Sequence, residues 1–400
     1  MLCWPAHDVA ADSAAAEESS ADRLSLLGGG DAQGLIRSIS ADGKVVVAGH
    51  NKPFSLQDMR RIRRDVKVQP RTDAKAIVHL VGGGRLLVDT FVVTDEQCVI
   101  DWAFGRGIKL PIEAVRGIQF DPANKIQAGA ARLARSLKET KSEDDQLFVK
   151  VSGGVQSVPG LLEKLGAESI VFNLKGKSKT FLREKIYGVV LAGLGAAEAT
   201  GPCRITLRDG SLLSGAIHSL ADGRLTVTPT AGASLTVPWK DVSEVVIRSD
   251  RILYLSEIEP QKVKQYSVVT RKRKWRKDLS VDGRPLTVGK TVFERGLGVH
   301  AYCNLTFARP DKYTTFAATL GIDEESRGKG DCLFVVLGDG KELLRERVRT
   351  GDRPKQVQVR IAGVKLLQLI VEPGEDLDLG DHADWCAARL IKDRQPVTKP

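Results

Sequence analysis

The chain has 400 residues, of which 42% are hydrophobic and 28% charged, as is typical of folded globular proteins. No apolar stretch is long enough for a membrane-spanning helix, which excludes that class of protein, and only 5% of residues are aromatic whereas 39 are glycine. The net charge of +10 is not a property of the whole surface, because the run from Arg271 to Lys277 alone contributes +6.

The first 22 residues differ in composition from the rest of the chain. They are rich in Ala, Ser, Asp and Glu, and they contain neither a basic n-region nor an apolar h-region. We interpret residues 1–22 as a disordered leader or as the remnant of an export signal whose beginning a misplaced start codon has removed.

A unit of strands and turns then recurs four times, most clearly in residues 203–247. Alternating apolar and polar residues flank the hairpin turns Asp209-Gly210 and Asp222-Gly223, and the unit ends with a strand, a short helical turn from Lys240 to Val242, and a last strand. Each unit of about 45 residues is expected to be a small, strongly bent sheet of five strands. The pattern is similar to that of SH3-like or Sm-like barrels. The expected ranges of the units are 23–70, 76–121, 146–193 and 201–248.

A helix is expected between the second and third units, in the linker of residues 122–145. Apolar side chains from Ile126 to Leu137 recur at helical spacing within residues 123–141, with basic residues elsewhere. The helix is short and has no aromatic anchor, so we expect it to pack as a linker and not on a membrane.

Residues 251–393 form a different kind of domain. Several short apolar runs separated by turns, with almost no helical periodicity, predict a β-sandwich. Two stretches are distinctive: residues 294–301, with glycines at positions 296 and 298 before an apolar run, and residues 380–385, which place two carboxylates, an imidazole and an indole together.

These stretches resemble the NPCBM family of carbohydrate-binding modules, over about residues 254–391. The resemblance rests on several segments in order: Tyr254 to Glu257, Trp275, Asp278 to Gly283, Pro285-Leu286, Gly296 to His300, Gly321 to Glu325, Gly328 to Gly330, and Asp381 to Trp385. The resemblance implies a galactose-binding-like β-sandwich of jelly-roll type that binds carbohydrate and is exported. The expected fold class is therefore all-β, with repeated small barrels followed by this sandwich.

A sugar site is expected on the loops of the sandwich, because a sugar needs several hydroxyl partners beside an apolar platform. Its candidate residues are Tyr302, Glu324, Asp381, His382 and Asp384. Trp385 and His300 are expected in the core. A structural role for Asp381 and Asp384, as caps of the turn before the last strand, remains the alternative.

The basic run offers a second kind of site. Arg271, Lys272, Arg273 and Lys274 surround the indole of Trp275 and could contact a polyanion, with a solvated loop as the plainer interpretation. An acidic loop from Asp323 to Asp331 could hold a structural calcium, although its spacing matches no known calcium loop. No cofactor is otherwise expected.

The six cysteines form no Cys-x-x-Cys pair, so a zinc ribbon or a thioredoxin-type site has no support. Cys303, Cys332 and Cys386 fall in the last domain, where at most one disulfide could form, and buried free thiols are the favoured interpretation.

No catalytic motif is present: the sequence has no Gly-x-Ser-x-Gly, no His-Glu-x-x-His and no phosphate-binding loop. We therefore expect a non-enzymatic carbohydrate-binding protein of the periplasm or cell surface, with a glycan as partner and the four units as scaffold. A cytoplasmic location stays open, as does the oligomeric state. The alternatives are a nucleic-acid-binding or polyanion-binding protein, which the scarcity of aromatics on the units disfavours, and a structural envelope protein without a sugar site.

Overall fold

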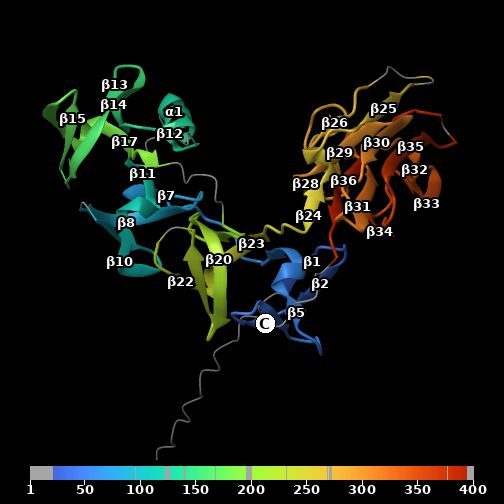
Figure 1. The fold of residues 1–400 in the computed structure, drawn as a ribbon, viewed down its shortest axis with the longest axis horizontal. Coiled ribbons are helices and arrows are strands. Elements are labelled where there is room, and N and C mark those ends of the chain that lie inside the picture. The colour runs from blue at the N-terminus through green and yellow to red at the C-terminus, as the bar shows by residue number, and fades with distance from the viewer. Residues whose placement is uncertain are drawn as a thin grey trace, which may run out of the picture.

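The computed structural model describes residues 21–393, apart from positions 95, 121, 123–126, 139–140, 167, 195–200, 231, 268, 270–272 and 376. In these residues strands predominate, arranged as a row of small groups followed by a sandwich of two sheets (Figure 1). The all-β fold class expected from the sequence is confirmed. No helix of the described residues is long and apolar enough to span a membrane.

The strands before residue 250 fall into four groups, which we interpret as four barrel units. Unit 1 contains β1 (Asp22–Leu26), β2 (Asp31–Gly34), β3 (Ile36–Ile39), β4 (Lys44–Val47), β5 (Phe54–Ser55), η1 (Leu56–Asp58) and β6 (Met59–Arg63). Unit 2 contains β7 (Ala76–Leu80), β8 (Arg85–Val93), β9 (Gln97–Trp102), β10 (Gly105–Pro111), η2 (Ile112–Ala114) and β11 (Val115–Phe120). Unit 3 contains β13 (Asp145–Val151), β14 (Gly154–Leu165), β15 (Ser169–Leu174), β16 (Lys177–Leu182), η3 (Arg183–Lys185) and β17 (Ile186–Val190). Unit 4 contains β19 (Cys203–Leu207), β20 (Leu212–Ala221), β21 (Arg224–Pro229), β22 (Leu235–Pro238), η4 (Trp239–Asp241) and β23 (Val242–Ile247).

Unit 2 shows the plan that the groups share. Its antiparallel order is β10-β9-β8-β7-β11, so the first strand pairs with both the second and the last. The long second strand β8 changes register between Val88 and Thr90, which lets one strand serve two faces of a bent sheet. In unit 1 the corresponding long strand is interrupted at Leu35. A 3-10 turn precedes the last strand in every unit, in unit 4 one residue before the position expected from the sequence.

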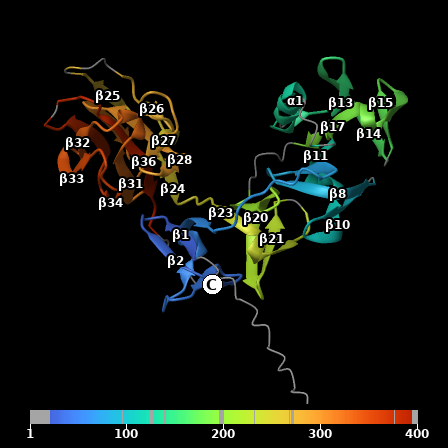
Figure 2. The same ribbon diagram turned by 180° about the vertical axis from the view of Figure 1, so that it is seen from behind.

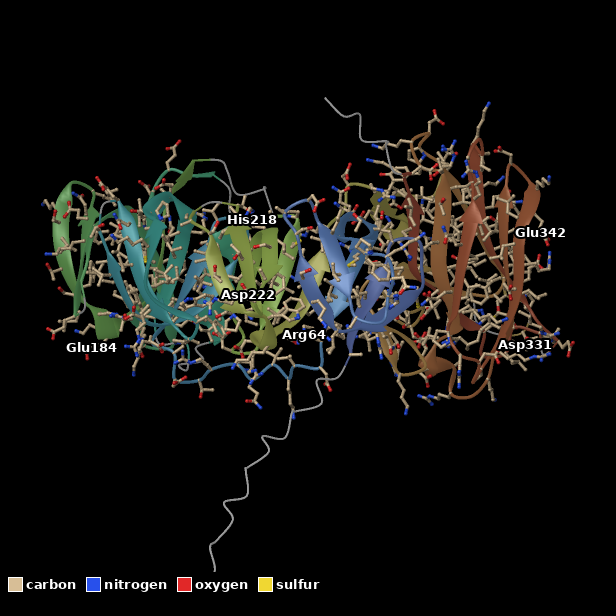
Figure 3. All side chains as sticks on the ribbon, turned by 90° about the horizontal axis from the view of Figure 1, so that it is seen from below. Arg64, Glu184, His218, Asp222, Asp331 and Glu342 are labelled. Atoms are coloured by element: carbon tan, nitrogen blue, oxygen red, sulfur yellow. The ribbon has the colours of Figure 1, made fainter. Side chains whose placement is uncertain are left out.

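The units do not lie in chain order. The last strands of units 2 and 3 pair (β11 with β17), as do those of units 1 and 4 (β6 with β23), and Leu212 of β20 meets Arg85 of β8 between the two pairs. The resulting order is 3-2-4-1, followed by the sandwich, as the turned view and the view from below both show (Figures 2 and 3). Between units 1 and 4 the Arg64 guanidinium lies 4.7 Å from the centre of the Trp239 ring.

Helix α1 (Gln127–Lys138) lies inside the range expected for the linker helix and packs on unit 3. Its Leu133 is buried in a small cluster with Phe148, Val155 and Tyr187. A short pair of strands, β12 (Lys141–Ser142) and β18 (Gly193–Leu194), joins the two ends of this region.

The C-terminal domain is a sandwich of two antiparallel sheets. The first sheet contains β24 (Ile252–Tyr254), β26 (Arg276–Lys277), β29 (Gly296–His300), β31 (Thr315–Ile322), β34 (Lys355–Arg360) and β36 (His382–Ile391). The second sheet contains β25 (Lys262–Gln265), β30 (Cys303–Ala308), β32 (Asp331–Gly338), β33 (Lys341–Arg349) and β35 (Leu366–Pro373). The remaining elements are η5 (Leu255–Glu257), η6 (Glu324–Ser326) and the hairpin of β27 (Leu286–Val288) and β28 (Thr291–Phe293).

The sandwich core centres on Trp385, which is fully buried. Its indole packs edge to face on Phe334 and Phe316, at ring-centre distances of 4.9 and 6.1 Å. The hairpin of β27 and β28 covers the outer face of the first sheet, to which β36 and its Trp385 belong. Gly321 allows this close approach, since a Cβ there would lie 2.0 Å from a methyl carbon of Val288.

The sandwich is joined to unit 1 by a buried arginine. Arg389, at the far end of β36, is 2% exposed and donates to the Leu27 carbonyl of unit 1 (2.9 Å) and to the Ala387 carbonyl (2.8 Å). Burial and the neighbouring charge of Arg60 lower the pKa of Arg389 to about 9. Arg251 adds an ion pair with Asp58 across the same junction.

The five cysteines of the described residues, Cys98, Cys203, Cys303, Cys332 and Cys386, are buried, and none of them is part of a disulfide. Cys303, Cys332 and Cys386 therefore form no disulfide with one another, as the sequence favoured.

Candidate functional site

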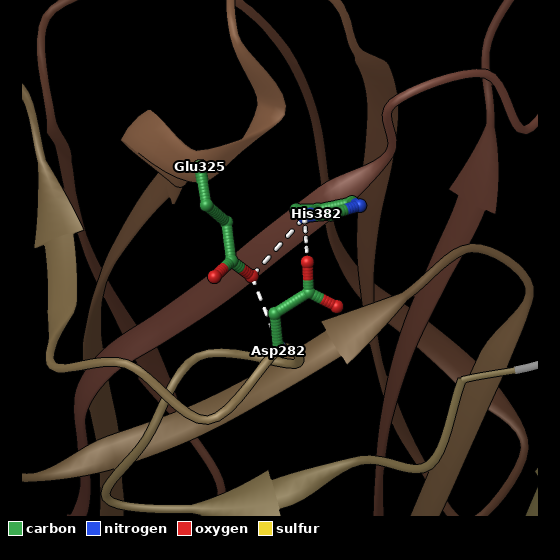
Figure 4. Close-up of side chains that lie close together, drawn as sticks. All are labelled: Asp282, Glu325 and His382. Atoms are coloured by element: carbon green, nitrogen blue, oxygen red, sulfur yellow. Dashed lines mark hydrogen bonds and ion pairs between the residues drawn. The ribbon is translucent and has the colours of Figure 1, made fainter.

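One end of the sandwich gathers the chemistry-bearing side chains. Strand β29 ends at His300 and β36 begins at His382, and these two residues are register partners. Their rings lie 5.6 Å apart. The turn that contains Asp282 and the 3-10 helix η6 reach the same end, and Figure 4 shows the side chains of Asp282, Glu325 and His382 close together there.

The centre of this site is a cluster of Arg273, Asp282, Glu325 and His382, which we call the polar cluster. Arg273 Nε lies 2.9 Å from Asp282 Oδ1, and its Nη1 lies 2.6 Å from His382 Nε2. His382 Nδ1 lies 3.1 Å from Glu325 Oε1 and 3.9 Å from Asp282 Oδ2. Since a guanidinium can only donate, the arrangement fits an imidazole whose Nε2 accepts from Arg273 and whose Nδ1–H donates to Glu325.

Glu325 is the most tightly held member of the polar cluster. Burial alone would raise the pKa of its carboxyl group, but hydrogen bonds from His382, from the Ser280 hydroxyl (2.7 Å) and from the Asp282 N–H (3.1 Å) outweigh burial and lower it. Glu325 is therefore a fixed anion. Asp282 and Arg273 are more open, with side chains 40% and 34% exposed.

A pair of stacked tyrosines lies beside the polar cluster. The Tyr266 and Tyr302 rings are 4.6 Å apart and nearly parallel, at 18°. Tyr266 is 56% exposed and Tyr302 is half-buried. The backbones of the two residues exchange hydrogen bonds, which fix the stack at the connection between β29 and β30. The stack offers the apolar platform that a sugar ring needs.

The structure brings together only part of the predicted sugar site. Tyr302 and His382 lie in the region just described, and Glu324 is exposed next to Glu325. His300 is buried behind His382, where burial lowers its pKa and its Nδ1 lies 2.7 Å from the Ala301 carbonyl.

The prediction that Asp381 and Asp384 contact a sugar directly needs correction. Asp381 is fully buried, and its Oδ1 accepts from the Asp331 N–H (3.0 Å), so its role is structural. Asp384 is 1% exposed on the outer face of β36, under the β27–β28 hairpin. Burial, reinforced by Asp323, raises the pKa of Asp384 well above its ordinary value, so this side chain is a buried neutral acid and not a surface acceptor.

Some side chains of the basic run form ion pairs within the domain. Arg271 and Lys272 lie outside the described residues. Arg273 belongs to the polar cluster, Lys277 pairs with Glu259 (2.6 Å), and Lys274 is exposed. The sequence therefore suggested a polyanion contact for Arg273, whereas in the structure its guanidinium contacts the Asp282 carboxylate and the His382 imidazole.

Four residues of the site were not predicted from the sequence: Tyr266, Ser280, Asp282 and Glu325. The signals for two of them were present, since Asp282 stands in an Asp-Gly turn and Glu325 directly follows Glu324. What the sequence does not reveal is which of the two glutamates points inward from the 3-10 turn.

The polar cluster also has the composition of a cation site. The ligand atoms of Asp282, Glu325 and His382 lie within 4.8 Å of one another. The Arg273 guanidinium already contacts two of these three side chains and supplies a positive charge there. The structural calcium considered for the loop from Asp323 to Asp331 remains a prediction.

A second concavity lies at the opposite end of the sandwich, beside unit 1. It has a volume of about 1150 Å³ and is lined by Leu26, Phe54, Arg251 and Ile391, among others. Four of its charged residues form ion pairs with one another, Arg251 with Asp58 and Lys44 with Asp42. The polar cluster is the better candidate because its hydrogen-bonding groups converge beside the Tyr266–Tyr302 stack, in which the Tyr266 ring is exposed.

The comparisons with known proteins agree with the sandwich. Residues 251–391 match the model of the NPCBM/NEW2 domain. A protein of Renibacterium salmoninarum named "Putative endo-alpha-N-acetylgalactosaminidase" is 32% identical over 111 residues, which is 28% of this chain and 7% of that protein. The present chain therefore matches a small part of that relative's length.

Two solved structures illustrate the likeness. The CBM51 module of a Clostridium perfringens GH95 protein, in complex with methyl-galactose, is 28% identical, with a TM-score of 0.32, and covers 35% of this chain and 99% of its own. The tandem CBM51 modules of a Streptococcus pneumoniae family 98 glycoside hydrolase are 14% identical, with a TM-score of 0.32, and cover 84% of this chain and 98% of their own.

Proposed function

We propose, from the NPCBM/NEW2 domain that residues 251–391 carry, that this protein binds a glycan through its C-terminal sandwich without transforming it. The four units serve as the scaffold that holds the sandwich. The observation that carries the proposal is the polar cluster beside the Tyr266–Tyr302 stack, since fixed donors and acceptors next to an aromatic face are what a sugar ring requires.

Each group has a definite role in this proposal. The exposed Tyr266 ring offers its face to the apolar side of the sugar. Asp282, Arg273 and Glu324 offer acceptors and donors to hydroxyl groups, while His382 and Glu325 hold Arg273 and Asp282 in place. Binding should be weak, because each sugar hydroxyl exchanges a hydrogen bond with water for one with protein.

The state of the carboxylates supports the non-catalytic role that we propose. Glycoside hydrolysis uses a carboxylic acid that protonates the leaving group and a second carboxylate across the bond. In the polar cluster Glu325 is held as an anion, and Asp384, the acid with the strongly raised pKa, is sealed inside the sheet. We expect no proton donor at this site. We also propose an exported or cell-surface location, where carbohydrate-binding modules meet their ligands.

A glycan array probed with the full chain tests the proposal and identifies the sugar. Calorimetric titration of that sugar into the Tyr266→Ala variant should show about a tenfold weaker affinity, roughly 1.4 kcal/mol. Arg345→Ala is the matched control, because Arg345 is an exposed and paired side chain on the distant strand β33. An array without any bound glycan, or equal affinities of the Tyr266→Ala variant and the wild type, would refute the proposed site.

A further inference from the structure

Four apolar side chains are exposed to solvent at the same end of the sandwich as the polar cluster. Tyr266 is 56% exposed, Val269 55%, Leu377 50% and Leu379 43%. They belong to two loops, one after β25 and one after β35. Loop tips of this kind are costly to leave in water, and a cluster of them marks a contact surface.

The two loops are fastened to each other by Asp378, so the four side chains form one surface, which we call the apolar tip. Asp378 is fully buried and accepts hydrogen bonds from the Ser267 hydroxyl and from the Val269 N–H (2.9 Å). Leu377 and Leu379 flank this buried anchor on either side. Leu377 also adopts a left-handed backbone conformation (φ 62°), which a leucine accepts only when the surroundings impose it.

Exposed lysines precede and follow one of the two loops of the apolar tip. Lys262 and Lys264 on β25 and Lys274 on the following loop are exposed, and they flank the loop that carries Tyr266 and Val269. Apolar side chains at the tip with lysines behind them are the arrangement that places a protein surface on a bilayer: the apolar groups enter the interface, and the lysines meet anionic lipid head groups. Tyrosine is well suited to the membrane–water interface, because its ring is apolar and its hydroxyl group can stay hydrated.

The geometry points to a lipid bilayer as the partner of this surface, and we infer that the sugar taken up by the polar cluster is the head group of a membrane glycolipid. This inference rests on the proposed function for its sugar part. The Tyr266–Tyr302 stack links the two surfaces, since Tyr266 belongs both to the sugar platform and to the apolar tip. A weak sugar contact and a weak lipid contact then reinforce each other, because the second forms at a high effective concentration once the first is made.

Co-sedimentation of the full chain with vesicles tests the inference. The vesicles consist of phosphatidylcholine with phosphatidylserine, alone or with galactosylceramide, lactosylceramide or globoside. The double variant Leu377→Ser, Leu379→Ser should bind glycolipid vesicles at least tenfold more weakly than the wild type, because two half-exposed leucines lose their transfer into the interface. Its affinity for the free head-group sugar should be unchanged.

Two further variants serve as controls. Leu366→Ser changes a leucine of similar exposure (41%) at the opposite end of β35 and should leave vesicle binding unchanged. Arg273→Ala should remove the preference for glycolipid vesicles over vesicles without glycolipid, but leave the contact with phosphatidylserine in place. Thermal unfolding of each variant shows whether it is folded, and Val269→Ser replaces the double variant if that one is unstable.

The outcomes separate the inference from the proposed function. The inference is overturned if the double variant binds vesicles as well as the wild type does, or if the protein sediments with none of the vesicles, even where free sugar still binds. The apolar tip would then be expected to contact a protein partner. If vesicle affinity is the same with and without glycolipid, and the same for wild type and Arg273→Ala, the proposed sugar site and the glycolipid ligand are both refuted.

Discussion

Strand β36 carries ionisable side chains at both ends, and these side chains differ in their exposure to solvent and in their bonding partners. At its start His382 meets Arg273, Asp282 and Glu325 at an edge that solvent reaches. Near its end Arg389 is sealed beneath unit 1 and donates to the carbonyl groups of Leu27 and Ala387. A guanidinium that is paired and partly open can exchange a partner for a ligand, whereas a buried one that is capped by carbonyls fixes one domain against another. The middle of the strand, with Asp384 and Trp385, is closed on both faces.

The largest effect should come from the middle of β36. Trp385→Ala removes a fully buried indole between Phe316 and Phe334, and should lower the free energy of unfolding by about 3–5 kcal/mol. Denaturant unfolding monitored by circular dichroism measures it. A loss below about 1 kcal/mol would mean that the core does not depend on this residue.

Arg389→Ala should have the next largest effect. It leaves the Leu27 carbonyl of unit 1 without its donor, and the expected loss of stability is about 1.5–3 kcal/mol, the range of a hydrogen bond to a charged group. Exposed and paired, Arg345 supplies the control, since its replacement by alanine should change stability by less than about 0.5 kcal/mol. If both variants unfold alike, the junction is not held by Arg389.

Asp384→Asn should change the pH dependence of stability. Because the pKa of Asp384 is raised in the folded protein, the folded chain keeps a proton that the unfolded chain releases above its ordinary value of 3.8. Its contribution to stability is therefore complete at low pH and is lost as the pH rises towards the folded-state pKa, by about 1.4 kcal/mol per pH unit. The asparagine variant lacks this loss.

Unfolding curves of the wild type and of Asp384→Asn between about pH 4 and pH 7 check this prediction. The difference in stability between the two should shift in favour of the variant as the pH rises. Parallel pH profiles would show that Asp384 is ionised at little cost in the folded state.

The smallest effect on stability should come from the open end of β36. Arg273→Ala removes an ion pair whose members are 34% and 40% exposed, and pairs of this kind contribute about 0–1 kcal/mol. Thermal unfolding should show a melting temperature close to that of the wild type. A loss comparable to that of Arg389→Ala would make the polar cluster a structural element.

The sequence predicted the strands, the sandwich and the burial of Trp385 because these depend on local alternation and turn residues. The expectation that Asp384 lies in a surface loop rested instead on chemistry, since a carboxylate can accept hydrogen bonds from sugar hydroxyl groups. All ten residues of β36 are buried, because the second sheet covers one face and the β27–β28 hairpin covers part of the other around Cys386. No pattern within residues 380–391 reveals that cover.

The order of the units was equally beyond the sequence. Which last strands pair depends on the complementarity of two sheet edges, and β6 meets β23, and β11 meets β17, across long stretches of chain. Arg273 stands in a run of basic residues that indicates a solvated loop, and its partners become visible only when the turn of Asp282 and the η6 helix are folded beside it. The sequence identifies these residues, but it does not predict which side chains or strands they contact.

Calorimetric titration of the sugar that the array identifies into wild type, Arg273→Ala and Arg389→Ala, well below their melting temperatures, shows whether the sugar binds at the polar cluster. We expect at least a tenfold loss of affinity for Arg273→Ala, roughly 1.4 kcal/mol, and an unchanged affinity for Arg389→Ala. Full affinity in Arg273→Ala would contradict this expectation, because the sugar would then bind somewhere other than the polar cluster.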